Sequence, residues 1–371
     1  MAVYPGFVGN TDRVSARTVN AERTINWYLE HATGTPKAPN WLVPTPGLDP
    51  FVVLGAGPVR ALFAEEGRCF AVGGGHFYEI LASQTFIHHG AVGTDGRPAS
   101  ISSNGSDGHQ LLIVSNGDGF IFDLNDNLFT PIIDDGFPVP VTMGAFIDGY
   151  FLALKGQSDQ FQLSSLENGL VWDALDVAQV SHTTGIVRAM VALHRELWLL
   201  GSSTTTVWAD IGDEFPFAPV PGGLIQQGIG SLFGWTVAAN SLYWHGQNED
   251  GGRVAVRANG YQVERISTHA VEHAWAELPT MQDTVCWGYQ DRGHAFACWY
   301  IPSAETTWVY DVTTNAWHER ALWDPTALVW TPHLARCHAF AFDRHLVGDR
   351  SSPAVYHLDA DTHTDGRVVL A

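Results

Sequence analysis

Lysine is nearly absent from this sequence, which has only Lys37 and Lys155 among its 371 residues. Basic residues number 19 against 39 acidic ones, and none of the basic residues form a run. Proteins that grip a nucleic-acid backbone need clustered lysine or arginine to displace counterions. The formal net charge of −20 therefore argues against a protein that binds the DNA backbone tightly. It indicates an acidic surface that favours solubility.

Long apolar runs are also missing, since no stretch approaches the roughly 18 residues that a membrane-spanning helix needs. The N-terminus, Met-Ala-Val-Tyr-Pro-Gly-Phe, has no basic stretch followed by an apolar core. We therefore expect no secretory signal.

Cysteine is scarce, and Cys69, Cys286, Cys298 and Cys337 form no C-x-x-C pair. Their spacing indicates neither a disulfide framework nor a zinc site. Cys286 and Cys298 could be cross-strand neighbours in one hairpin, but buried free thiols are the default expectation.

What the sequence does contain is a repeat of about forty residues, from residue 58 to the C-terminus. Each unit has a short apolar run, a glycine-containing turn and a second apolar run with an aromatic residue. Five units show this clearly, at residues 70–80, 112–124, 197–208, 242–256 and 346–358. Strand-length segments repeating at this period are typical of a β-propeller. We predict an all-β propeller of seven blades, although six or eight also fit, because units three and six are irregular.

The predicted units span residues 58–97, 98–138, 139–184, 185–228, 229–268, 280–322 and 334–371. The last unit shows only three clear strands. Residues 1–57 are rich in proline and asparagine, so we interpret them as an N-terminal arm beside a propeller of residues 58–371. Closing a propeller removes free sheet edges, and we expect residues 51–54 of the arm to supply the missing strand.

One segment breaks the strand pattern. Residues 267–278 contain alanines and straight-chain residues, start at a Ser-Thr pair and meet Pro279, which predicts a short inserted helix. Val271, Trp275 and Leu278 share one face of this helix. Together with Trp323 and Trp330, they are the candidate residues for an interface with another protein.

The motifs that could support catalysis or metal binding are weak. His269-Ala-Val-Glu272-His273 matches a zinc-peptidase pattern, but without a third ligand we interpret these as surface histidines. Residues 123–127 resemble the start of a calcium loop but fail at its sixth and twelfth positions, so we expect a turn. Tyr310 and Trp317 resemble the paired aromatics of a kelch hairpin, which are core residues. We expect no catalytic, cofactor or metal site and no enzymatic activity.

Several stretches recur together in one known family. They are HRELWLLGSSTTTVW (194–208), GDEFPF (212–217), IQQGI (225–229), RANGY (257–261), RISTH (265–269), GHAF (293–296), WVYD (308–311), WHER (317–320), HLVGD (345–349) and PTPGL (44–48). In these motifs the chain resembles the packaged-DNA stabilisation proteins of short-tailed phages, also called tail accessory or tail hub proteins. The resemblance runs from about residue 24 to 365.

The resemblance implies a structural virion protein of the phage tail, made in the cytoplasm of the host bacterium. Copies in that family, usually about six, form a ring below the portal and its adaptor ring. The ring closes the tail channel, retains packaged DNA without sequence-specific binding, and gives attachment points for needle, fibre or spike proteins. It implies no catalytic residues and no membrane span. Many members continue past the propeller with a smaller β-domain, which we do not expect within these 371 residues.

Two other functions fit a propeller. One is carbohydrate or receptor binding, with Trp275, Trp323 and Trp330 as stacking platforms. The other is glycoside hydrolysis, which needs a carboxylate pair facing the central channel. Mass measurements would separate the ring-forming protein from these alternatives.

Overall fold

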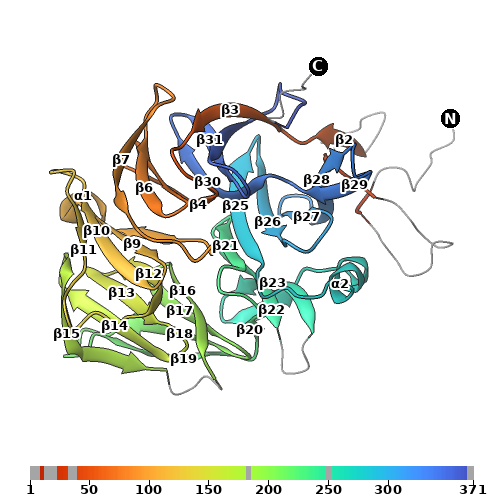
Figure 1. Cartoon of the computed structure of the whole chain (residues 1–371). Helices are drawn as coiled ribbons and strands as arrows, with labels where there is room; N and C mark the ends of the chain where they lie inside the picture. Colours follow the sequence, from red (N-terminus) through yellow and green to blue (C-terminus); the bar gives the residue numbers. More distant parts are fainter. Residues whose placement is uncertain (1–8, 12–22, 32–39, 181–184, 248–251, 366–371) are drawn as a thin grey trace, which may run out of the picture.

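Seven antiparallel sheets surround a central axis (Figure 1). This computed structural model describes residues 9–11, 23–31, 40–180, 185–247 and 252–365. The sheets follow one another in sequence order, and inner strands of neighbouring sheets contact each other around the axis. Each sheet is thus one blade, and the predicted all-β propeller with seven blades is confirmed.

Blades 1 to 3 have four strands each, in sequence order from the axis to the rim. Blade 1 consists of β4 (Val59–Glu65), β5 (Arg68–Gly73), β6 (His76–Ile80) and β7 (Phe86–Ala91). Blade 2 consists of β8 (Ser100–Ser103), β9 (Gln110–Ser115), β10 (Asp118–Asp123) and β11 (Phe129–Pro131). Blade 3 consists of β12 (Val141–Ile147), β13 (Tyr150–Lys155), β14 (Gln160–Ser165) and β15 (Asn168–Gln179).

Blades 4 to 6 are less uniform. Blade 4 consists of β16 (Val187–Leu193), β17 (Glu196–Gly201), β18 (Thr205–Asp210) and β19 (Phe217–Ile225). In blade 5, β20 (Gly228–Ile229) and β21 (Trp235–Ala238) both pair with β22 (Ser241–Gln247), which is followed by β23 (Arg253–Asn259) and β24 (Gln262–Arg265). Blade 6 consists of β25 (Val285–Asp291), β26 (His294–Tyr300), β27 (Thr307–Asp311), β28 (Ala316–Asp324) and β29 (Val329–Pro332).

Blade 6 extends past its predicted end at residue 322. Residues 316–320 of β28 pair with β27, whereas residues 321–324 pair with β29. The predicted boundary is too early because β28 continues past its pairing with β27 into a second hairpin with β29. No sequence signal marks this continuation.

Blade 7 is completed from the other end of the chain. Its inner strands are β30 (Ala335–Ala341), β31 (Arg344–Asp349) and β32 (Ala354–Asp359), and its outermost strand is β3 (Gly47–Val53). Gly47 lies opposite Asp359, and Val53 lies opposite Ala354. Residues 51–53 thus lie in the strand that closes the propeller, while the division of the chain at residue 57 stays a prediction.

Preceding β3, the hairpin of β1 (Trp27–His31) and β2 (Asn40–Pro44) forms a separate two-stranded sheet. It lies against blade 6, because β1 contacts β28. The predicted inserted helix is α2 (His269–Ala276), whose N-cap Thr268 accepts a hydrogen bond from the backbone of Val271. A second helix, α1 (Gly105–Gly108), is a single turn between β8 and β9.

Turn chemistry explains the tight hairpins within blades. Asn116 and Gly117, between β9 and β10, have φ values of 58° and 91°. Asp148 and Gly149, between β12 and β13, have φ values of 48° and 90°. Positive φ at both central residues suits the right-handed twist of the flanking strands, and Asn, Asp and Gly tolerate it best.

The core lies between neighbouring sheets. One cluster joins blades 3, 4 and 5 through residues that include Leu152, Leu199 and Trp244, all without exposed surface. Each leucine buried in this way stabilises the fold by roughly 1.5–3 kcal/mol. Across the described ranges, no helix has both the length and the apolar character needed to cross a membrane.

Candidate functional site

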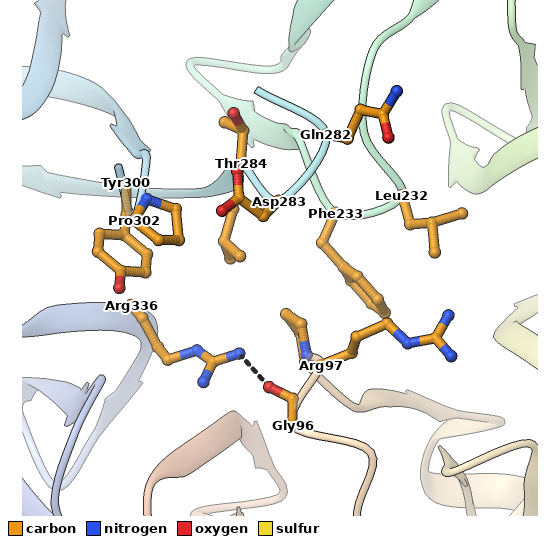
Figure 2. Close-up of a pocket in the computed structure, with 12 residues that line it drawn as sticks. Gly96, Arg97, Leu232, Phe233, Gln282, Asp283, Thr284, Tyr300, Pro302 and Arg336 are labelled. Atoms are coloured by element: carbon orange, nitrogen blue, oxygen red, sulfur yellow. Dashed lines mark hydrogen bonds between the residues drawn. The ribbon is translucent and has the colours of Figure 1, made fainter. Parts of the chain in front are cut away.

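The mouth of the central channel holds a cavity of about 250 Å³ (Figure 2). The connection before β8 supplies Arg97, the connection before β21 supplies Phe233, and the segment before β25 supplies Asp283. Arg336 enters from β30, beneath the Tyr300 hydroxyl. Two neighbouring cavities of about 410 and 300 Å³ share Phe233 with it. The mouth is therefore a partly open depression lined by both polar and apolar side chains.

Arg336 is the buried charge of this mouth. It is 7% exposed, and Nη2 donates to the carbonyl oxygen of Gly96 at 3.3 Å. Burial lowers the pKa of its guanidinium. Asp283 is the one carboxylate among the residues described as lining this cavity, whereas Asp95 lines the neighbouring cavity of about 410 Å³ and is paired with Arg60 and Arg97.

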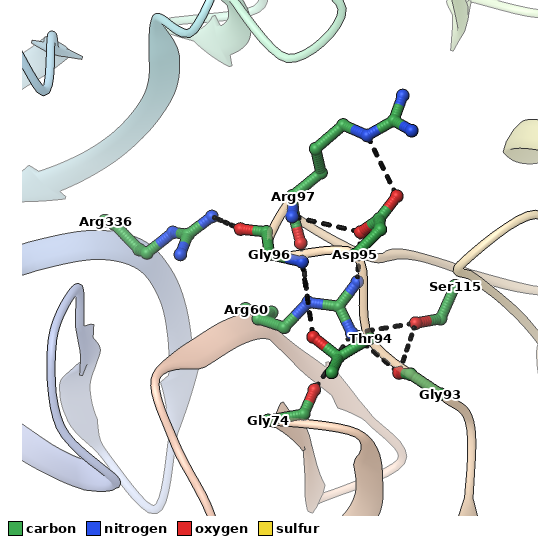
Figure 3. Close-up of polar contacts among 9 residues, drawn as sticks. All are labelled: Arg60, Gly74, Gly93, Thr94, Asp95, Gly96, Arg97, Ser115 and Arg336. Atoms are coloured by element: carbon green, nitrogen blue, oxygen red, sulfur yellow. Dashed lines mark hydrogen bonds and ion pairs between the residues drawn. The ribbon is translucent and has the colours of Figure 1, made fainter.

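Arg60 is a second buried arginine, and its polar contacts join neighbouring blades (Figure 3). It is 1% exposed and lies in β4. Its Nε donates to the carbonyl of Arg97 at 2.6 Å, and Nη1 donates to the carbonyl of Gly93 at 3.0 Å and to Oγ of Ser115 at 2.9 Å. Nη2 lies 3.0 Å from Oδ1 of Asp95. One side chain thus ties blade 1 to the following connection and to blade 2.

Arg188 holds the same position in blade 4. Arg60, Arg188 and Arg336 each occupy the second position of an inner strand, where the pairing register shifts by one residue. Arg188 donates to the carbonyls of Ile229 and Gly230 at 2.9 and 3.2 Å. These arginines bind blades to one another, so the charge at the mouth has a structural explanation.

The sequence prediction missed this set. A signal was present, because Val-Arg-Ala occurs at residues 59–61 and 187–189 and Ala-Arg-Cys at residues 335–337. An arginine between small or branched apolar residues, at the start of a repeat unit, is the pattern to look for.

The apolar face of helix α2 belongs to the core. Val271 and Trp275 have no exposed surface and pack in a cluster with Trp299 and Trp317, and half-buried Leu278 packs against the same cluster. The prediction that Val271 and Trp275 lie at an interface is wrong, because the blade itself covers the stripe. Leu278 remains a predicted interface residue only through its exposed part.

Arg253 fastens the end of this helix. Its Nη1 donates to the carbonyls of Trp275 and Leu278 at 2.6 Å each, where helix carbonyls have no intrahelical partner. Arg257 and Arg265 form ion pairs with Glu264 and Glu272. These two arginines thus pair with acidic side chains, whereas Arg253 binds backbone carbonyls.

Trp323 and Trp330 lie at the surface of blade 6. They face each other across β28 and β29, with ring centroids 5.2 Å apart. Trp323 is 46% exposed, and neighbouring Leu328 and Val329 are exposed as well. Trp323 and Trp330 stay predicted interface residues.

The arm hairpin is joined to blade 6 by buried charges. Nε2 of His294 lies 2.8 Å from Oε2 of Glu30, and Nδ1 lies 2.7 Å from Oδ2 of Asp311. Burial alone would lower the pKa of His294, but the hydrogen bond to Glu30 and the charge of Asp311 outweigh it and raise that pKa. Nearby, Arg23 pairs with buried Glu319 at 2.6 Å.

The zinc-like motif is a helix surface. His269 and His273 are exposed, and Glu272 is bound to Arg265 and Ser267. Asp123 forms a turn between β10 and β11, because Oδ1 accepts from the backbone of Asn125 and Asp126. Within the described ranges, no group of three or more metal-binding side chains occurs.

The cysteines are free thiols that are buried or half-buried. Cys286 and Cys298 share the β25–β26 hairpin but lie one position out of register, opposite Trp299 and Trp287 respectively. They therefore occupy opposite faces of the sheet. Burial raises the pKa of Cys298 to about 12.

The aromatic pair of the kelch-like hairpin is also part of the core. Tyr310 lies opposite Trp317, and both are buried. Their ring centroids are 5.3 Å apart. The prediction that both residues support the fold is confirmed.

Solved structures similar to this chain are β-propellers or domains that contain them. They include the extracellular domain of a putative one-component system from B. thetaiotaomicron (TM-score 0.56, 9% identity, 84% of this chain, 40% of that chain). They also include a streptogramin B lyase (TM-score 0.53, 12% identity, 84% of this chain, 96% of that chain). A third is virginiamycin B lyase from Staphylococcus aureus (TM-score 0.54, 9% identity, 84% of this chain, 98% of that chain). At these identities the likeness shows the fold alone.

No curated protein matches the sequence. A family model described as phage stabilisation, "Bacteriophage P22 Gp10, beta-propeller", matches residues 26–363, which span all seven blades. The chain therefore belongs to this phage stabilisation family and is a structural protein of a bacteriophage virion.

Proposed function

We propose that this protein is a tail hub, of which about six copies form a ring below the portal and its adaptor. The ring closes the tail channel, retains packaged DNA and offers attachment points to needle, fibre or spike proteins. The observation that carries this proposal is the family match over residues 26–363. The part played is structural and not catalytic.

The closed fold suits a ring subunit. Strand β3 covers the edge of β32, so blade 7 does not end in an unfinished sheet. Closed propellers are rigid discs with short, protected edges. Rigid discs can repeat around an axis without distortion, which a cyclic assembly requires.

The negative charge of this protein suits a channel through which DNA passes without being bound tightly. Only 19 basic residues face 39 acidic ones in the sequence, and Arg60, Arg320 and Arg336 are buried. The surface therefore offers even fewer cations than the composition suggests. Binding to the DNA backbone depends on exposed cations that displace counterions, so contact with packaged DNA is expected to be weak and independent of sequence.

Light scattering of the purified chain tests this proposal, alone and after addition of the portal–adaptor complex of the same phage. We expect a complex that carries about six copies. A chain that never joins that complex, at any protein concentration tested, would overturn the proposal.

One cavity favours receptor or carbohydrate binding as a second candidate. A pocket of about 400 Å³ between blades 4 and 5 is lined by Trp198, Tyr243 and Tyr261, with Glu196 and Arg257. Trp198 and Tyr243 are buried, but Tyr261 is 37% exposed, and an exposed aromatic ring beside charged groups is suited to bind sugars. A glycan array compared with the Tyr261→Ala variant tests this, and fluorogenic glycosides test hydrolysis.

A further inference from the structure

The outer strand of blade 3 differs from the other six rim strands. Strand β15 has twelve residues and contains no proline, lysine or arginine. The others are shorter, and the two longest of them carry proline: β19 has nine residues with Pro219 and Pro221, and β3 has seven with Pro50. The pairing of β15 with β14 is irregular at two points, and β15 carries Asp173 and Asp176, which limit pairing through the backbone edge. Strand β15 is thus the longest rim strand without proline, and a partner would contact its side chains.

Apolar side chains are exposed on and beside this strand. Leu175 is 85% exposed, Val171 44% and Val177 40%. Ile133 is 88% exposed and lies beside them, because its neighbour Asp134 accepts a hydrogen bond from the backbone of Trp172. We call Ile133, Val171, Leu175 and Val177 the blade 3 surface. Exposed apolar clusters of this kind mark protein-binding surfaces.

The charge of blades 2 and 3 disfavours pairing of this surface with itself. Residues 98–180 contain eleven acidic side chains and a single basic one, Lys155. Asp135 and Asp173 are exposed next to the apolar residues. Two copies that met through the same surface would bring these carboxylates together, and like charges at an interface disfavour association. The partner therefore presents a different surface.

A second exposed apolar surface lies on the far side of the disc. We call Trp323, Leu328, Val329 and Trp330 the tryptophan hairpin; Trp323, Leu328 and Val329 are 46%, 69% and 47% exposed. It belongs to blade 6, which lies three blades from blade 3 in one direction and four in the other. Figure 1 shows β15 and the β28–β29 hairpin at opposite sides of the propeller.

We propose that the tryptophan hairpin of one copy packs on the blade 3 surface of the next copy, an inference that rests on the proposed ring. A head-to-tail ring needs two different surfaces on each subunit, placed apart from each other. Tryptophan is enriched at the energetic centres of interfaces, and the blade 3 surface offers aliphatic side chains to receive it.

The first test uses the full chain and the portal–adaptor complex. Leu175→Asp and Trp323→Ala should each reduce the copies retained on that complex roughly tenfold or more. Leu175 is 85% exposed and Trp323 46%, so the melting temperature of the free chain should change little. Ile211→Asp, at another exposed apolar residue, is the matched control and should assemble normally.

Cross-linking with a short bismaleimide distinguishes head-to-tail contact from contact between two blade 3 surfaces. The double variant Leu175→Cys with Leu328→Cys should give a ladder beyond dimer on the complex, because each copy links to two neighbours. Neither single variant should give more than background cross-linking. Dimers from Leu175→Cys alone would show that the blade 3 surface meets itself, which would overturn the inference.

Failure of this inference is distinguishable from failure of the ring itself. If the wild-type chain joins the complex in about six copies, but Leu175→Asp and Trp323→Ala do so equally well, the hub stands and this interface is wrong. If the wild-type chain never joins, both proposals fall.

Discussion

The imidazole of His294 lies between two carboxylates, with Nε2 2.8 Å from Glu30 and Nδ1 2.7 Å from Asp311. Asp311 is in the same blade, whereas Glu30 is in the arm hairpin, so this histidine fastens the arm to the propeller. The attachment depends on protonation, because both contacts favour the imidazolium.

The stability conferred by His294 should depend on pH. Its folded-state pKa is raised above the ordinary 6.5. The contribution is therefore complete below about pH 6.5 and is lost as the pH rises through the folded-state pKa. We expect the free energy of unfolding of His294→Gln to differ more from wild type at pH 6 than at pH 9. Glu30→Gln should flatten that dependence, and parallel curves for all three proteins would contradict the assignment.

Removing the Arg60 side chain should destabilise the fold strongly. Arg60→Ala leaves several carbonyls and Ser115 without their donor in a site that is almost fully buried. We expect a loss of about 3–5 kcal/mol in urea unfolding. Arg97→Ala is the control, since Arg97 pairs with the same Asp95 at the surface and should change stability by less than about 1 kcal/mol. Equal effects would show that Arg60 does not join the blades.

Trp275→Ala should act on the monomer and not only on an assembly. A fully buried tryptophan replaced by alanine costs about 3–5 kcal/mol. Differential scanning calorimetry of the free chain should show a much lower melting temperature, while His269→Ala, on the exposed side of the same helix, should leave it nearly unchanged. A Trp275→Ala chain that melts normally would restore this residue as an interface candidate.

Truncation of the arm should separate its two parts. Removing residues 1–45 leaves β3 in blade 7, and we expect a monomer that still melts cooperatively. Removing residues 1–57 deletes β3 and exposes the edge of β32, so we expect self-association in light scattering. Two truncations with the same mass and melting behaviour would show that β3 is dispensable for closure.

The thiols should be unreactive in the native state. Burial raises the pKa of Cys69, Cys298 and Cys337 to about 12 and that of Cys286 well above its ordinary value. The thiolate is the reactive form, so Ellman's reagent should react slowly with the native chain and quickly with all four cysteines in denaturant. Rapid release from the native chain would mean that a blade opens.

Local chemistry was readable from the sequence. The Asn116-Gly117 turn, the Thr268 N-cap and the unit period each depend on neighbouring residues, so the blades and the inserted helix could be predicted. Pairing partners distant in sequence could not. Glu30 meets His294 only because the arm folds back on blade 6, and nothing near either residue indicates the other.

Whether a side chain is buried was the other property that could not be predicted from the sequence. The apolar stripe of α2 has the same spacing whether it faces a partner or its own blade, and the structure places Trp275 against Trp317. Arg60 was overlooked for the opposite reason, since a single arginine in an apolar strand carries no motif until its bulge and its carbonyl partners are seen. Trp323 stays exposed in the part of β28 that extends beyond its pairing with β27.

The pairing of β3 with β32 also sets an order for synthesis. A ribosome makes β3 before every blade and β32 after all the other strands of the propeller. Nascent chains can fold their blades one by one, but the disc cannot close until β32 has left the exit tunnel and met a strand made at the start. A ribosome that stalls early thus releases an open chain, and such products would be excluded from virion assembly by the fold itself.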